Sequence, residues 1–255
     1  MDLSVDNLSL TVDNKTILSK IYFALPQNKV SVILGKNGAG KSSLLKCCSK
    51  VTSAYTGKIL FNKKNIKNTP SQDLAKKIAW CPESMALCFN FPVLDFVTLG
   101  RFPWHLGSPQ NEDRLKSEQT LRDLKIDHLK YKNYLNLSSG EKKLAIIAHT
   151  LVGEQKMLLF DEPTANLDLR NSLKIISLFK KMKKVGKTIC FTTHNIHLAL
   201  KYSDYILVLH NGKILTHANK EEIDLSIVEK AFQVSLKTLK LKNNFFFDYE
   251  TNLRT

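Results

Sequence analysis

The stretch Gly35-Lys36-Asn37-Gly38-Ala39-Gly40-Lys41-Ser42 decides the fold of this chain of 255 residues, because it matches the phosphate-binding pattern G-x-x-x-x-G-K-S. The apolar residues 30–34 before it predict a buried strand, and residues 42–48 after it predict a helix. Glycines let the backbone curl so that its N–H groups point at an anion, and the helix N-terminus adds partial positive charge. Residues 35–42 are therefore expected to bind nucleotide phosphates, with Lys41 on the β- and γ-phosphates and the Ser42 hydroxyl on Mg²⁺.

The composition is that of a globular protein, with 43% hydrophobic residues. No run approaches the roughly 20 apolar residues of a membrane span. The first residues lack the basic and apolar regions of a signal peptide, so we expect a cytoplasmic protein. The five cysteines show no metal-ligand spacing and are expected to be buried apolar side chains.

The net charge of +15 permits nucleic acid or anionic lipid headgroups as neighbours. Much of this charge is scattered lysine, which is typical of a solvated surface. Because no basic stretch is interleaved with aromatic residues, nucleic acid is not the expected partner.

The order of apolar runs predicts strands alternating with helices. Strands are expected in the first 25 residues and over 58–61, 78–81, 157–160 and 188–192. A short helix is expected over 74–78 and an aromatic-rich loop over 100–105. Residues 83–152 have helical spacing, a long helix follows Asp168, and Asn211-Gly212 predicts a hairpin turn. This order indicates an α/β fold.

Ligands of α/β sheets bind at the carboxyl ends of the strands, and three charged or polar side chains are predicted there. Asp161 ends an apolar run and is expected to hold Mg²⁺, while Glu162 is placed to polarise the attacking water. His194 follows another strand and is expected to contact the γ-phosphate. A helix cap and a structural histidine are the alternatives, and the phosphate loop favours catalysis.

Three further motifs make the chain resemble the ATP-binding-cassette (ABC) ATPases: Leu137-Ser138-Ser139-Gly140-Glu141, Phe160 to Asp168, and Thr193-His194. The resemblance implies a single P-loop NTPase domain over 1–255, with a RecA-like core, an N-terminal antiparallel β-subdomain and an inserted helical subdomain. The core is expected over about 1–82 and 153–220, the helical subdomain over about 83–152, and a C-terminal extension over about 221–255.

The resemblance also implies a head-to-tail dimer with a second copy or a close relative. Two ATP molecules would lie between the subunits, each on one P-loop and under Ser138, Ser139 and Gly140 of the other subunit. Asp168, in the D-loop, is a further expected nucleotide contact, and Val12 is expected against adenine.

A narrower resemblance, to importers of ferric siderophores, haem and vitamin B12, is carried by Leu99-Gly100-Arg101-Phe102-Pro103, by Glu112-Asp113 and by residues 192–199. It implies an ATPase subunit on the cytoplasmic face of the cell membrane, a polytopic permease and, indirectly, a substrate-binding protein. A coupling helix of the permease is expected against residues 83–105. Phe102 and Trp104 suit that contact, and packing inside the helical subdomain is the alternative.

The chain departs from the family's pattern at four places. Glu83 replaces a glutamine and would still bind Mg²⁺, but it adds negative charge beside the phosphates. Val12 replaces an aromatic residue, and Ser139 replaces a glycine. The run Lys142-Lys143-Leu144, with His149, replaces glutamines and arginines that brace the subdomain.

The sequence thus predicts an ATPase that energises an importer. A soluble ABC ATPase of iron–sulfur assembly or nucleic-acid work is the alternative that the charge favours. A cassette that binds ATP without efficient turnover is another, which Val12, Glu83 and Ser139 favour and the intact Lys41 and Glu162 oppose.

Overall fold

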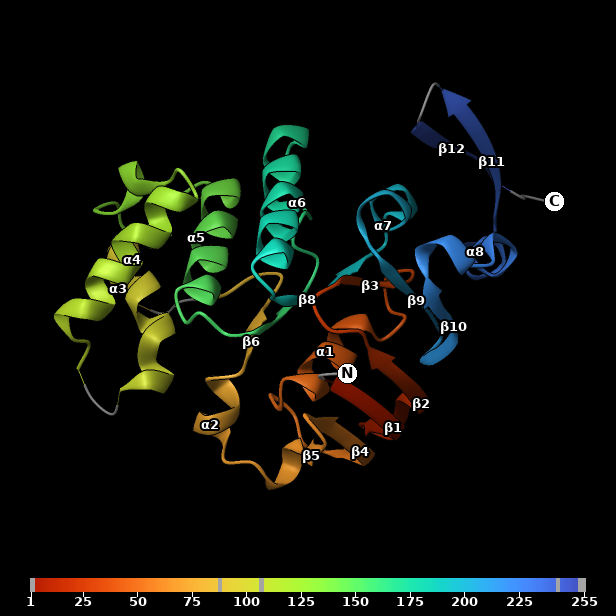
Figure 1. The fold of residues 1–255 in the computed structure, drawn as a ribbon, viewed down its shortest axis with the longest axis horizontal. Helices are drawn as coiled ribbons and strands as arrows, with labels where there is room; N and C mark the ends of the chain where they lie inside the picture. Colours follow the sequence, from red (N-terminus) through yellow and green to blue (C-terminus); the bar gives the residue numbers. More distant parts are fainter. Residues whose placement is uncertain (1–2, 87–88, 106–107, 242–243, 252–255) are drawn as a thin grey trace.

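The computed structural model describes residues 3–86, 89–105, 108–241 and 244–251. Its centre is a six-stranded sheet in which five strands are parallel and β10 is antiparallel at the edge (Figure 1). In spatial order the strands are β10 (Lys213–Asn219), β9 (Tyr205–His210), β3 (Val30–Leu34), β8 (Thr188–Thr193), β7 (Met157–Phe160) and β6 (Ile78–Cys81).

The three central strands β3, β8 and β7 are buried along their whole length, as expected for parallel strands covered on both faces. Val32 belongs to the apolar cluster on one face of the sheet, and its neighbour Ile33 to the cluster on the other. On the first face Phe179 of α6 (Leu169–Lys184) packs between Phe160 and Phe191. Successive side chains of a strand thus point to opposite faces of the sheet, and this alternation decides which of the two apolar clusters each side chain joins.

A second, antiparallel sheet packs on the other face together with α1 (Lys41–Cys48). Its strands, in spatial order, are β2 (Lys15–Leu25), β1 (Leu3–Val12), β4 (Tyr55–Phe61) and β5 (Lys64–Asn65). The 3₁₀ turn η1 (Ile66–Asn68) and α2 (Ser71–Ala75) lead from this sheet to β6. The predicted helix over 74–78 is wrong, because the helix begins directly after Pro70 and Ile78 already pairs with Met157.

A group of helices lies beside the β6 edge of the central sheet (Figure 1). It contains α3 (Val93–Thr98), η2 (Leu99–Trp104), α4 (Asn111–Asp123), η3 (Asp127–Leu129), η4 (Tyr134–Asn136) and α5 (Ser139–Leu151). The loop predicted over 100–105 is wrong, because most of it forms the 3₁₀ helix η2, which continues directly from α3. A Cβ atom on Gly100 would lie 2.0 Å from the carbonyl oxygen of His149, so only glycine permits η2 to pack this closely on α5.

The remaining elements are helices outside the central sheet and a hairpin that forms a separate two-stranded sheet. They are α7 (Ile196–Tyr202), η5 (Lys220–Glu222), α8 (Leu225–Phe232) and the hairpin β11 (Val234–Leu241) with β12 (Asn244–Thr251). The predicted turn at Asn211-Gly212 is confirmed: both residues have positive φ, and His210 pairs with Lys213.

Four cysteines are buried as expected: Cys47, Cys48, Cys81 and Cys190. Cys88 and the polar tail at 252–255 lie outside the described residues. Within the described ranges, no helix combines the length and the apolar character needed to cross a bilayer.

Candidate nucleotide site and a neighbouring groove

The phosphate loop lies between β3 and the first residue of α1, where the sequence placed it. Gly38 and Gly40 have φ values of 80° and 102°, which L-residues with side chains rarely adopt. A Cβ atom on Gly40 would also lie 2.9 Å from Cδ2 of Leu18 in β2. The turn into α1 therefore requires glycine, and it places the start of α1 beside the loop.

Lys41 lies across the concave side of this loop and is almost fully buried. Its Nζ donates hydrogen bonds to the carbonyl oxygens of Gly35, at 2.8 Å, and Lys36, at 3.2 Å. The same ammonium lies 3.2 Å from Oε1 of Glu162. The loop lysine is thus paired with a carboxylate from the end of β7.

Asp161 and Glu162 follow β7 directly and are fixed by one buried hydroxyl, that of Thr192 in β8. The Thr192 Oγ1 atom donates to Oδ1 of Asp161 at 2.7 Å and accepts from the backbone N–H of Glu162 at 2.8 Å. Thr192 thereby orients both acidic residues, as a partner behind a metal ligand does. No motif in the sequence points to Thr192, and its position at the end of a buried strand was the available signal.

Glu162 and His194 lie next to each other, with Nδ1 of His194 3.3 Å from Oε1 of Glu162. Glu162 has a φ of 42°, a left-handed backbone that holds its side chain over the site. His194 is half exposed, with 53% of its side chain accessible. A cavity of about 640 Å³ is lined by Glu162 and His194 together with Asn37 of the loop and Glu83.

The predicted metal ligands are the Ser42 hydroxyl and the carboxylates of Glu83 and Asp161. These are oxygen donors, the kind Mg²⁺ prefers, and few enough to leave positions for phosphates and water. Ser42 is the second residue of α1, Asp161 follows β7, and Glu83 lies two residues beyond β6. The donor set therefore fits Mg²⁺ bound jointly with the phosphates of a nucleotide.

Lys143 of α5 is a second buried ammonium at the site, at a position that in the sequence stands out only as a departure from the family's pattern. Its Nζ donates to the carbonyl oxygen of Glu83 at 2.8 Å and to that of Asp161 at 3.4 Å. Burial lowers the pKa of Lys143, while the carboxylates of Glu83, Asp161 and Glu162 act in the opposite direction.

The signature residues begin α5, with Ser138 as the N-cap. Ser138 Oγ accepts from the N–H of Glu141 at 3.3 Å, and the Glu141 carboxylate accepts from the N–H of Ser138 at 2.9 Å. Ser138 and Ser139 are exposed, and neither they nor Gly140 line the cavity that contains Glu162. One chain therefore does not bring its own signature residues into the cavity beside its phosphate loop.

Two other predicted nucleotide contacts, Val12 and Asp168, lie outside the lining of this cavity. Val12 ends β1, pairs with Lys15 and leaves 47% of its surface exposed. Asp168 caps α6: its Oδ1 accepts from the N–H of Asn171 at 2.7 Å. The predicted contact of Asp168 with a nucleotide stays a prediction.

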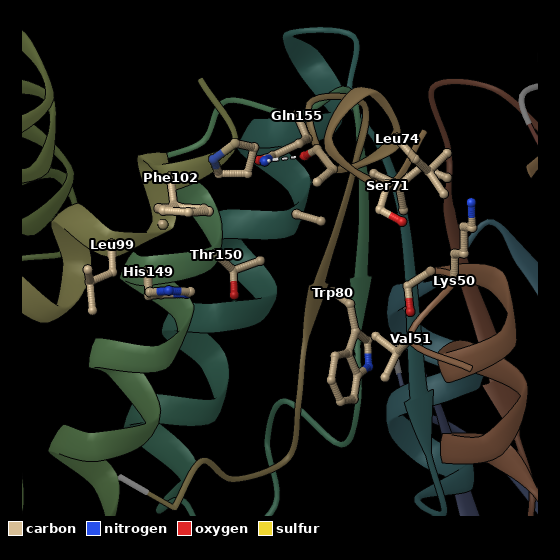
Figure 2. A pocket seen from close by; sticks show the side chains of 16 residues that line it. Lys50, Val51, Ser71, Leu74, Trp80, Leu99, Phe102, His149, Thr150 and Gln155 are labelled. Carbon is tan, nitrogen blue, oxygen red and sulfur yellow. Dashed lines mark hydrogen bonds between the residues drawn. The ribbon is translucent and has the colours of Figure 1, made fainter. Parts of the chain in front are cut away.

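A groove of about 370 Å³ lies between the end of α1, α2, β6 and η2 (Figure 2). Phe102 lines it and is 64% exposed. Two buried polar atoms of its lining have no hydrogen-bond partner among the described residues, the Nε1 of Trp80 and the Oε1 of Gln155. Trp104 donates from its indole N–H to the carbonyl oxygen of Gly153 at 3.1 Å, which fixes its ring against the helical group, and 37% of the residue stays exposed.

Comparison with known proteins gives a consistent result. The family model described as ABC transporter matches residues 18–165. The petrobactin import ATP-binding protein YclP of Bacillus subtilis is 31% identical over 94% of this chain and 96% of its own length. The iron(3+)-hydroxamate import ATP-binding protein FhuC of the same organism is 28% identical over 91% of this chain and 88% of its own length.

Among solved structures, a transporter described as of the metal-chelate ABC type, in an inward-facing conformation, superposes with a TM-score of 0.82. It is 25% identical and covers 98% of this chain and 96% of its own. A second structure, cbiO1 from Clostridium perfringens, described as part of the transporter complex cbiONQ, has a TM-score of 0.75 at 30% identity, over 91% of this chain and 93% of its own. With the loop, the Asp161-Glu162 pair and the fold in agreement, the chain belongs to the ABC transporter family and is an ATP-binding ATPase of that family.

Proposed function

We propose that this chain hydrolyses ATP to drive an importer of iron chelates, bound to a polytopic permease on the cytoplasmic face of the cell membrane. The groove beside η2 carries this proposal, because it is an apolar hollow between strand β6 of the central sheet and the helical group, with the dimensions of a site for a partner's side chains. The names of the similar proteins support the chemical class of the cargo.

The groove suits a coupling segment of the permease for three reasons. Phe102 offers an exposed aromatic surface of the kind enriched at protein interfaces. The unpartnered Trp80 N–H and Gln155 carbonyl oxygen are buried polar groups whose burial costs free energy, so a rearrangement of the groove wall around a docked segment can be favourable. The groove also joins β6 to η2, and Glu83 follows β6 by two residues, so a shift in the groove has a short path to the nucleotide.

Substitution of Phe102 tests the docking site. We expect Phe102→Asp to abolish stimulation of ATP hydrolysis by the purified permease and to leave nucleotide binding by the isolated chain unchanged. Leu115→Asp is the matched control, since Leu115 is also 64% exposed but lies on α4 away from the groove. Equal permease-stimulated hydrolysis by wild type and Phe102→Asp would reject this groove as the docking site.

In the proposed mechanism each residue of the cavity has one task. Bound Mg²⁺ would neutralise phosphate charge, held by the oxygens of Ser42, Glu83 and Asp161. Glu162 accepts the proton of the attacking water, and His194 fixes the carboxylate and contacts the γ-phosphate. When the nucleotide binds, the Lys41 ammonium exchanges Glu162 for the phosphates. The Glu162 carboxylate is then free to act as the base.

We propose further that the site is completed by a second copy of the chain, arranged head to tail. Ser138 and Gly140 do not line the cavity of their own chain, although Gly140 lies beside Leu167 of its wall, and this supports the arrangement. The N-terminus of α5 presents N–H groups that suit a γ-phosphate on the partner's loop. Dimer closure would then depend on the γ-phosphate, and hydrolysis would release it.

The cargo class is tested by uptake. In cells that lack this chain, we expect uptake of radiolabelled ferric chelate to be lost, and to return with wild type but not with Glu162→Gln. Unchanged iron uptake combined with lost cobalamin or haem uptake would reject the iron-chelate assignment. Salt-dependent retention on RNA or DNA, with no recovery alongside membranes, would favour the soluble alternative that the +15 charge suggests.

A further inference from the structure

Lys143 reaches the nucleotide site from the helix that carries the signature residues. Its side chain is buried, with only 5% of the residue exposed. Its ammonium donates to the backbone carbonyl oxygens of Glu83 and Asp161. Both of these residues also carry the carboxylates proposed to bind Mg²⁺. Lys143 therefore lies directly behind the metal-binding segments rather than on the surface of the cavity.

The ammonium of Lys143 has no ion pair within the part of the chain that the structure describes. A buried ammonium costs free energy unless opposite charge lies close by. The carboxylates of Glu83, Asp161 and Glu162 act on Lys143 through space, and the shorter of its two carbonyl hydrogen bonds, at 2.8 Å, is to the backbone of Glu83. Its positive charge is thus balanced through space by the acidic residues of the site.

The charges at the site indicate what the contact of Lys143 with the Glu83 and Asp161 segments does. Three carboxylates, those of Glu83, Asp161 and Glu162, lie near two buried ammoniums: Lys41 pairs with the Glu162 carboxylate, and Lys143 donates to the backbone of Glu83 and Asp161. Without Lys143, the carboxylate of Glu83 would add an uncompensated negative charge where the phosphates of ATP must bind. Because Glu83 lines the same cavity as Glu162, we expect one such charge to change nucleotide affinity by about tenfold.

We infer that Lys143 is the counter-charge of Glu83, a positioning residue that permits a carboxylate at this metal-binding place while MgATP still binds. The inference rests on the proposed assignment of Glu83 and Asp161 to Mg²⁺. It also changes the interpretation of two departures from the family's pattern, since Glu83 and Lys143 compensate each other and are no sign of a degraded site. The two carbonyl bonds additionally hold the start of α5 against the Glu83 segment.

A double-mutant cycle tests this pairing on the isolated chain, by titration of ATP in excess Mg²⁺. We expect Lys143→Gln to weaken MgATP binding by about tenfold, because Glu83 is then uncompensated. The double substitution Glu83→Gln with Lys143→Gln should bind within about threefold of wild type. Lys142→Gln, a change at the neighbouring lysine, should bind like wild type and serves as the matched control.

The same cycle distinguishes the alternatives. Melting temperatures of all variants separate loss of charge from loss of fold, and Lys143→Arg, which keeps the charge, should retain binding. If Lys143→Gln weakens binding by the same factor with and without Glu83→Gln, Lys143 is only structural and the inference is overturned. If wild type itself binds ATP without need of Mg²⁺, the proposed metal assignment fails instead.

Discussion

The Nζ atom of Lys41 lies 3.2 Å from Oε1 of Glu162, so the phosphate-loop lysine and the proposed general base form a buried ion pair. Glu162 is also 3.3 Å from Nδ1 of His194. Both side chains of the pair are nearly buried, and the Lys41 ammonium stays paired with Glu162 until a phosphate competes for it. Nucleotide binding is therefore expected to exchange one ion pair for another, and to leave Glu162 free to accept a proton.

Replacement of Glu162 by glutamine should separate binding from hydrolysis. Because the amide cannot accept the proton of water, we expect Glu162→Gln to lower the turnover number by about 10²–10⁴-fold. Lys41 loses its carboxylate partner in this variant, so MgATP affinity should be equal to or higher than that of wild type. Steady-state hydrolysis and nucleotide titration measure the two effects, and equal turnover in both proteins would remove Glu162 from the role of base.

Loss of Lys41 should affect affinity first. Lys41→Ala removes the only side-chain cation of the loop that contacts Glu162, and it leaves that buried carboxylate without its ion-pair partner. We expect MgATP affinity to fall at least tenfold, with a lower melting temperature for the unliganded chain. Lys46→Ala is the control, because Lys46 lies on the same helix and is exposed. Similar ATP affinities for the two variants would contradict the assignment of the loop.

His149 should make stability depend on pH. Its ring stacks on Phe96 at 5.0 Å, and burial lowers its pKa to about 4, against about 6.5 in the unfolded chain. Between these values the unfolded chain binds a proton that the folded chain does not. The free energy of unfolding therefore includes a part that depends on neutral His149. This part is complete above about pH 6.5 and is lost as pH falls towards 4, with about 2 kcal/mol already lost at pH 5.

Urea unfolding of wild type and His149→Gln at pH 7 and pH 5 measures this contribution. We expect the free energy of unfolding of wild type to fall by about 2 kcal/mol more than that of the variant. Other titrating groups contribute to both proteins and cancel in the difference. An identical pH dependence in the two proteins would show that His149 is protonated without penalty in the folded chain.

The Arg101–Asp113 pair should be a main support of the helical group. Nε of Arg101 donates to Oδ1 of Asp113 at 2.9 Å, and both side chains are buried. We expect Arg101→Ala to cost about 3–5 kcal/mol of unfolding free energy, because it leaves the Asp113 carboxylate buried without that partner. Arg122→Ala, at an exposed position, should change stability by less than about 0.5 kcal/mol. A loss below about 1 kcal/mol in Arg101→Ala would show that water or His105 replaces the arginine.

The parts of the fold with strong local signals could be predicted from sequence. The glycine spacing at residues 35–42, the apolar runs of the central strands and the Asn211-Gly212 turn each depend on neighbours in the chain. The 3₁₀ helix η2 could not be placed correctly, because it depends on a distant contact, that of Gly100 against His149. The end of α2 likewise depends on the distant pairing of Ile78 with Met157, whereas its start after Pro70 had a local signal that the prediction missed. For the same reason, the sequence alone did not indicate the tasks of Thr192 and Lys143, whose partners come from other elements.

Mixing two inactive variants tests most directly whether the ATP site is shared between two copies of the chain. Lys41→Ala disables the phosphate loop, and Gly140→Asp places a negative charge in the signature segment. A mixed dimer contains one site with an intact loop and an intact signature, so hydrolysis by the mixture should exceed that of either variant alone at least tenfold. No recovery on mixing, or wild-type turnover by Gly140→Asp alone, would contradict the shared site.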